Sequence, residues 1–94
     1  MKRWIVLARD SLQEYLTLGQ EALEALTAGD KVALSRILLR RTLVFQRYCR
    51  IESLAAASGY DVSKHASMID LWMQIDSTNV LFNDEYQSGE LLAS

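Results

Sequence analysis

The stretch that most constrains the fold is residues 28–59, because positions 30–58 contain neither glycine nor proline. Gly29 is followed at once by Asp30, so a residue that favours a helix end precedes one that favours a helix start. Gly59 follows Ser58 at the other end. This punctuation predicts a long helix over residues 31–57, with Asp30 as its N-cap and both glycines in the left-handed conformation.

Residues 3–27 are predicted to form an amphipathic helix that precedes this one. Trp4, Tyr15 and Ala22 flank its apolar face. The apolar face itself consists of Ile5, Ala8, Leu12, Leu16, Gly19, Leu23 and Leu26, and the opposite face holds Asp10, Glu14, Glu21 and Glu24. Because the turn at residues 27–29 is short, the next helix must run antiparallel and alongside.

The helix over residues 31–57 has a wide apolar arc made of two ridges. One ridge consists of Ile37, Val44, Tyr48 and Ile51, and the other consists of Leu34, Leu38, Phe45 and Cys49. A wide arc predicts that this is the central helix of three, and it places Cys49 in the core. Arg41 projects into the same arc, where an arginine needs a carboxylate or carbonyl partner. Structural pairing is the favoured interpretation, and a buried anion or ligand site is the alternative.

A third helix is predicted over residues 62–87, capped by Asp61 or Ser63. Asn79 lies on its core face and is interpreted as a residue that fixes helix register. The other core residues are Met68, Leu71, Trp72, Ile75, Phe82 and Tyr86. We expect residues 88–94 to leave the helix at Gly89 and fray, with Leu91 and Leu92 available as an apolar latch. The predicted fold is therefore all-α, an antiparallel bundle of three long helices in one domain, residues 1–94.

Composition narrows the functional class. The chain has no proline, is 50% hydrophobic and 23% charged, and carries a net charge of −2, which argues against disorder and against nucleic-acid binding. The apolar run at residues 4–8 is too short for a signal peptide or a membrane span. A single cysteine cannot form an internal disulfide. These features predict a soluble cytoplasmic protein that does not insert into membranes.

Two surfaces are candidates for partner binding. Ile69, Met73 and Val80 form an apolar strip beside Trp72 that a three-helix bundle does not cover, so it is predicted to face a helical partner. The second surface is a basic stripe on residues 31–57, made of Arg36, Arg40, Arg47 and Arg50 and interleaved with Leu39, Leu43 and Leu54. This stripe is interpreted as a solvated face that pairs with acids of the neighbouring helices, and docking of an acidic partner is the alternative.

The sequence offers no set of residues for catalysis, a cofactor or a metal. The single histidine, His65, is expected to be an exposed first-turn residue, and it has no second histidine or cysteine at metal-ligand spacing. We therefore expect no enzyme activity. The enzyme alternative is a small all-α protein of the chorismate mutase type, which would require Arg36, Arg40 or Arg41 to meet other polar groups in an enclosed pocket.

Residues 23–48 resemble the first hairpin of the flagellar type III export chaperones, the FliT-like and FlgN-like proteins. The matching positions are Gly29, Asp30, Leu34, Leu38 and Arg41, and residues 75–86, with Asn79 and Asn83, are similar to the third helix of that family. The resemblance implies a cytoplasmic bacterial protein that binds a helical segment of a filament-associated export substrate and prevents its early assembly. The alternative is a homodimeric structural or adaptor subunit in which the apolar strip forms the dimer seam.

Overall fold

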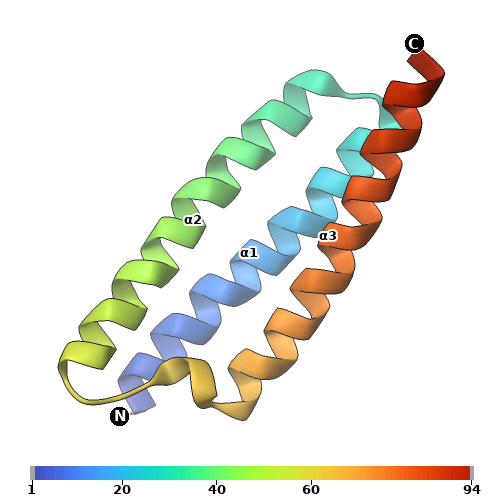
Figure 1. The fold of residues 1–94 in the computed structure, drawn as a ribbon. Helices are drawn as coiled ribbons and strands as arrows, with labels where there is room; N and C mark the ends of the chain where they lie inside the picture. The colour runs from blue at the N-terminus through green and yellow to red at the C-terminus, as the bar shows by residue number, and fades with distance from the viewer. Residues whose placement is uncertain (1, 94) are drawn as a thin grey trace.

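The computed structural model describes residues 2–93, which form three long α-helices and one short 3-10 helix. These elements are α1 (Lys2–Ala28), α2 (Lys31–Ala57), η1 (Val62–Lys64) and α3 (Ala66–Ala93), and consecutive long helices run antiparallel (Figure 1). No strand occurs among the described residues. The all-α prediction of three helices packed against each other is confirmed.

The turn between α1 and α2 has the conformation that its glycine predicts. Gly29 has a φ of +73°, and the backbone N–H of Asp30 donates to the carbonyl of Ala25 at 3.0 Å, as in a Schellman motif. The carboxylate of Asp30 then accepts from the backbone N–H of Ala33 at 3.0 Å, which caps α2. Gly59, with a φ of +83°, ends α2 in the same way.

The central helix of the bundle is α1 rather than α2, so the prediction that the second helix is central is wrong. Helix α1 lies between the other two (Figure 1), and no Cα atom of α2 lies within 8 Å of one of α3. Small side chains favour this position, because they let neighbouring helices approach the backbone of α1 closely. The small buried residues of α1 are Ala8, Ser11, Gly19, Ala22 and Ala25.

An aromatic cluster fills the space between the two outer helices. The ring centroid of Trp72 on α3 lies 6.2 Å from that of Phe45 and 5.9 Å from that of Tyr48, both on α2. Tyr15 of α1 completes the cluster at 5.3 Å from Phe45. The bulk of these rings separates the backbones of α2 and α3. The ring contacts also stabilise the arrangement, since edge-to-face pairs at such distances are favourable.

Several side chains that were predicted to be core are exposed. Cys49 is exposed, and Leu38 and Tyr86 are only partly covered. No Cα atoms of α2 and α3 come within 8 Å, so side chains such as the aromatic cluster make the contact between these helices. Leu38 borders a pocket that Tyr15, Arg41, Thr42 and Phe45 also line. The core predictions for Leu12, Tyr48, Met68 and Ile75 are confirmed, since all four are almost completely buried.

Helix α3 begins later than predicted. Asp61 caps the short η1 helix, where its carboxylate accepts from the backbone N–H of Ser63 at 3.1 Å. The start of α3 is capped instead by His65, whose Nδ1 lies 3.2 Å from the backbone nitrogen of Ser67. His65 is thus a half-buried capping residue rather than an exposed first-turn residue, and the predicted start at residue 62 is wrong.

Helix α3 also extends further than predicted. It continues to Ala93, so the predicted end at residue 87 and the predicted exit from the helix at Gly89 are wrong. Residue 94 lies outside the described residues, and fraying of residues 88–94 stays a prediction. Gly89 sits inside the helix, and its cost of about 1 kcal/mol relative to alanine is offset by the good helix formers that follow it. The predicted latch of Leu91 and Leu92 involves side chains outside the described part.

Replacing Tyr48 by phenylalanine is expected to stabilise the protein by about 1 kcal/mol at neutral pH. The Tyr48 side chain is 2% exposed, and its hydroxyl has no hydrogen-bond partner among the described residues. Removing an unsatisfied buried hydroxyl while keeping the ring relieves its desolvation cost. Urea unfolding measures the change, and a loss of 1 kcal/mol or more would show that the hydroxyl is bonded after all.

The same hydroxyl predicts a loss of stability in alkali. Burial raises the pKa of Tyr48 to about 12, from an unfolded value near 10. The folded state therefore prefers the neutral phenol, so this contribution is fully present below about pH 10 and is lost as the pH rises towards 12. The Tyr48→Phe variant should lack this part of the alkaline destabilisation.

Candidate partner-binding surfaces

The apolar strip on α3 is exposed to solvent. Ile69, Met73 and Val80 retain 49%, 64% and 58% of their accessible surface, and at 3.6 residues per turn they lie within about 40° of one another. Trp72 lies beside the strip and is half-buried by the aromatic cluster. The strip is therefore an exposed apolar line on a helix whose other side is anchored in the core, as the sequence predicted, and Asp76 lies beside it between Met73 and Val80.

Acidic side chains border this strip. Asp76 and Asp84 fall on its two sides in helical projection, and α3 contains five acidic residues and no basic one. The exposed Leu81 lies about 100° further round the helix from Val80, outside the strip. A partner of the strip would thus meet apolar surface in a field of negative potential.

The basic stripe on α2 is mostly free of ion pairs. Within the described residues, Arg47 is the member that forms one: its Nη2 lies 3.4 Å from the carboxylate of Glu14 and its Nε donates to the hydroxyl of Ser11 at 3.1 Å. Arg36 and Arg50 are exposed and make no ion pair among residues 2–93. The predicted pairing with acids of a neighbouring helix therefore applies to one arginine of the four.

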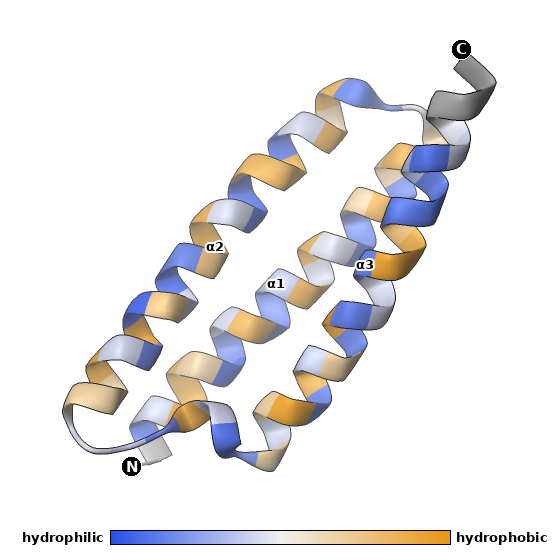
Figure 2. Ribbon diagram, in the orientation of Figure 1, coloured by the Kyte–Doolittle hydropathy of each residue, from blue (hydrophilic) through white to orange (hydrophobic). Residues whose placement is uncertain are grey.

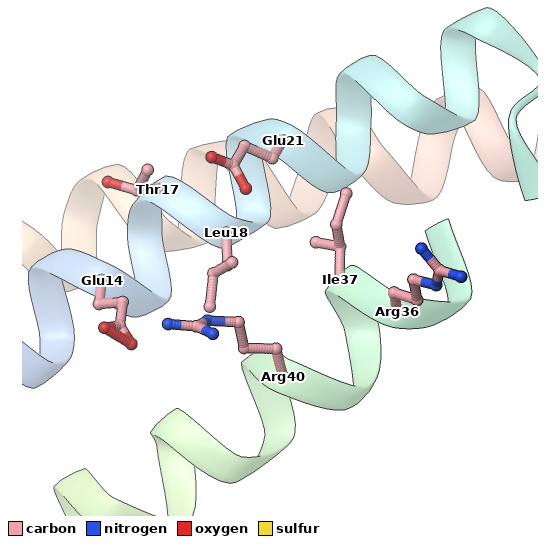
Figure 3. A pocket seen from close by; sticks show the side chains of 7 residues that line it. All are labelled: Glu14, Thr17, Leu18, Glu21, Arg36, Ile37 and Arg40. Atoms are coloured by element: carbon pink, nitrogen blue, oxygen red, sulfur yellow. The ribbon is translucent and has the colours of Figure 1, made fainter. Parts of the chain in front are cut away.

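A hollow between α1 and α2 contains two more members of the stripe (Figure 3). Arg40 extends toward Glu14 there, while Arg36 and Glu21 contribute opposite charges to the two walls. The two acids and two arginines balance each other, so the hollow offers no excess charge to an ionic ligand. Its apolar base includes Leu18, a buried residue that periodicity placed outside the apolar face of α1.

Arg41 connects all three helices. Its Nε donates to the backbone carbonyl of Tyr15 at 3.1 Å, its Nη2 donates to the side-chain oxygen of Asn79 at 2.9 Å, and its guanidinium carbon lies 3.9 Å from the Tyr15 ring centroid. Burial lowers the pKa of Arg41, and the electrostatic interaction with Tyr15 raises it by a smaller amount. The predicted structural pairing is confirmed with a carbonyl and an amide as partners.

The position of Arg41 also bears on the enzyme alternative. Arg41 points into the space between α2 and α3, whereas Arg36 and Arg40 line the hollow between α1 and α2. The enzyme alternative, in which one of these arginines meets other polar groups in an enclosed pocket, stays a prediction from the sequence.

Gly19 is the residue that makes room for this arginine. A Cβ at Gly19 would lie 2.6 Å from Arg41 Nη2 and 2.9 Å from its guanidinium carbon, both too close for an ordinary contact. Glycine inside a helix normally costs about 1 kcal/mol, so its presence here has a packing reason.

Replacing Gly19 by alanine is expected to destabilise the protein by about 1 kcal/mol, because displacing the Arg41 guanidinium outweighs the gain in helix propensity. Gly89→Ala is the matched control: nothing lies within 4 Å of its added Cβ, so it should stabilise by about 0.5–1 kcal/mol. Thermal unfolding measures both. Equal stabilisation by the two variants would show that Arg41 moves aside freely.

No group of three or more potential metal-ligating side chains occurs among residues 2–93. In the same range, no helix carries an apolar stretch long enough to cross a bilayer. Comparisons with known protein families, with curated proteins and with solved structures found no match to this chain. The fold and the exposed surfaces define a small three-helix protein, and the resemblance to the flagellar export chaperones stays a prediction from the sequence.

Proposed function

We propose that this protein binds an amphipathic helix of another polypeptide along the strip formed by Ile69, Met73 and Val80. The observation that carries the proposal is that three large apolar side chains stay about half or more exposed in one line of a well-packed helix. Helix-in-groove recognition uses anchors at this kind of spacing. The flexible thioether of Met73 suits such a surface, since methionine adapts its shape to a partner.

Charge complementarity identifies the kind of helix. Helix α3 has a net charge of −5 over residues 66–93, and Asp76 and Asp84 border the strip. A partner helix with lysine or arginine beside its apolar side would gain attraction, whereas an acidic helix would be repelled. The proposed client segment is therefore apolar along one line and basic along its margins.

The resemblance of residues 23–48 and 75–86 to the flagellar type III export chaperones supports a more specific hypothesis. In this hypothesis the client is a flagellar export substrate, the protein is cytoplasmic, and binding keeps the client segment from assembling early. The role of Ile69, Met73 and Val80 does not depend on that assignment, because it comes from exposure and charge.

Two synthetic helical peptides of equal length test the proposal. Both place leucine at i, i+4, i+7 and i+11; one is flanked by lysine and the other by glutamate. In fluorescence anisotropy the lysine-flanked peptide should bind at least about tenfold more tightly, and added salt should weaken its binding. Equal binding of the two peptides, or no binding of either, would contradict the proposal.

A further inference from the structure

The two outer helices carry opposite charge. Helix α2 holds six basic residues and one acidic residue, a net charge of +5, and α3 has a net charge of −5. The helices are also of matching length, 27 and 28 residues. Since α1 lies between them (Figure 1), the molecule has one basic long edge and one acidic long edge. Such an arrangement attracts copies of itself as well as other proteins.

The outward side of α2 combines apolar and basic side chains, which are the features expected of a partner of the α3 strip. Leu39, Leu43 and Leu54 are all more than half exposed on it, and the unpaired arginines Arg36 and Arg50 lie among them in helical projection. Apolar and hydrophilic residues alternate along this helix (Figure 2). The outward side of α2 therefore combines exposed leucines with basic side chains, as the proposed client segment does.

We propose that the exposed leucine–arginine face of α2 in one copy docks on the acidic, apolar strip of α3 in a second copy. The attraction between a +5 helix and a −5 helix selects this pairing over α2 with α2 or α3 with α3, which are repulsive. Burial of leucines against Ile69, Met73 and Val80 supplies the apolar contribution.

Because the two faces differ and lie on opposite edges, the contact is heterologous. In a pair, one copy keeps an unused α3 strip and the other keeps an unused α2 face, so association continues until a ring closes or a chain grows. A copy whose α3 strip is occupied cannot bind a client there. Self-association would thus regulate the client site, a consequence that rests on the proposed function, whereas the contact itself does not.

Sedimentation velocity of the full chain, over a concentration series at about 50 and 500 mM salt, tests the contact. We expect reversible association that weakens at least about tenfold at the higher salt, because the Debye length shortens about threefold. Two double variants isolate the faces: Arg36→Glu with Arg50→Glu on α2, and Asp76→Lys with Asp84→Lys on α3. All four side chains are exposed, and each variant alone should lose association by at least tenfold.

Mixing the two double variants is the decisive step. One retains a wild-type α3 and the other a wild-type α2, so the mixture should recover the association that each variant alone has lost. A wild-type protein that stays monomeric, association that ignores both reversals, or a mixture that stays monomeric would overturn the inference. Binding of the lysine-flanked peptide to a wild-type protein that stays monomeric would support the client site and contradict self-association. Association of copies without peptide binding would support self-association and contradict the client site.

Discussion

Replacing Arg41 by alanine is expected to lower the free energy of unfolding by about 3 kcal/mol, the largest effect of any single substitution proposed here. The change removes two hydrogen bonds from a charged donor and the contact with the Tyr15 ring, and it leaves a void beside Gly19. It also leaves the side-chain oxygen of Asn79 without a partner in a partly buried place. Urea unfolding followed by circular dichroism measures the loss.

A double-mutant cycle separates the hydrogen bonds from the packing. Arg41→Met keeps most of the side-chain volume and should cost about half as much as alanine, since only the polar contacts are lost. Adding Asn79→Leu to Arg41→Met should recover part of that loss, because neither polar partner then remains unsatisfied. A cost below about 1 kcal/mol for Arg41→Ala would contradict a structural role and would favour the alternative, in which Arg41 serves a ligand.

The double variant Met73→Asp with Val80→Asp is expected to weaken binding of the lysine-flanked peptide by about 100-fold or more. Each substitution removes an apolar anchor and would bury a carboxylate in the contact, at a cost of at least about 1.4 kcal/mol, or tenfold, per site. Both side chains are more than half exposed in the free protein, so the fold should not change. Peptide anisotropy measures the binding, and circular dichroism measures the helix content.

Leu81→Asp is the matched control for this variant. Leu81 is 57% exposed, against 58% for its neighbour Val80, and the substitution adds one negative charge to the same helix, as each substitution of the double variant does. Because it lies outside the strip, it should leave peptide binding within about twofold. Equal loss of binding in the control and the double variant would mean that added charge, and not the strip, is responsible. Loss of helix content in the double variant would mean that Met73 or Val80 belongs to the core.

The local features of the fold follow directly from the sequence. Gly29 and Gly59 predict both helix ends because a left-handed residue past a helix terminus is nearly a glycine property. Asp30 predicts the start of α2 because its carboxylate can satisfy an unpaired backbone N–H. The end of α3 is different: Gly89 resembles Gly29 in sequence, but no turn or neighbouring helix requires the chain to change direction there.

The arrangement of the helices is harder to predict because apolar residues cover more than one side of α2. Helical periodicity places the apolar residues Leu38, Leu43 and Cys49 around the helix, but it does not show which of these sides faces a neighbouring helix. The informative signal was the set of small residues along one broad arc of α1, which lets neighbouring helices approach its backbone closely. Charge segregation between α2 and α3 is visible in the sequence, yet its meaning as two opposite edges depends on α1 lying between them.

The most direct test of the α3 strip as a binding surface is two-dimensional NMR of the isotope-labelled protein during titration with the lysine-flanked peptide. We expect the largest chemical-shift changes at Ile69, Met73 and Val80, together with the indole N–H of Trp72. Changes concentrated instead on the pocket lined by Arg41 and Phe45, with the strip unaffected, would contradict the role of the strip.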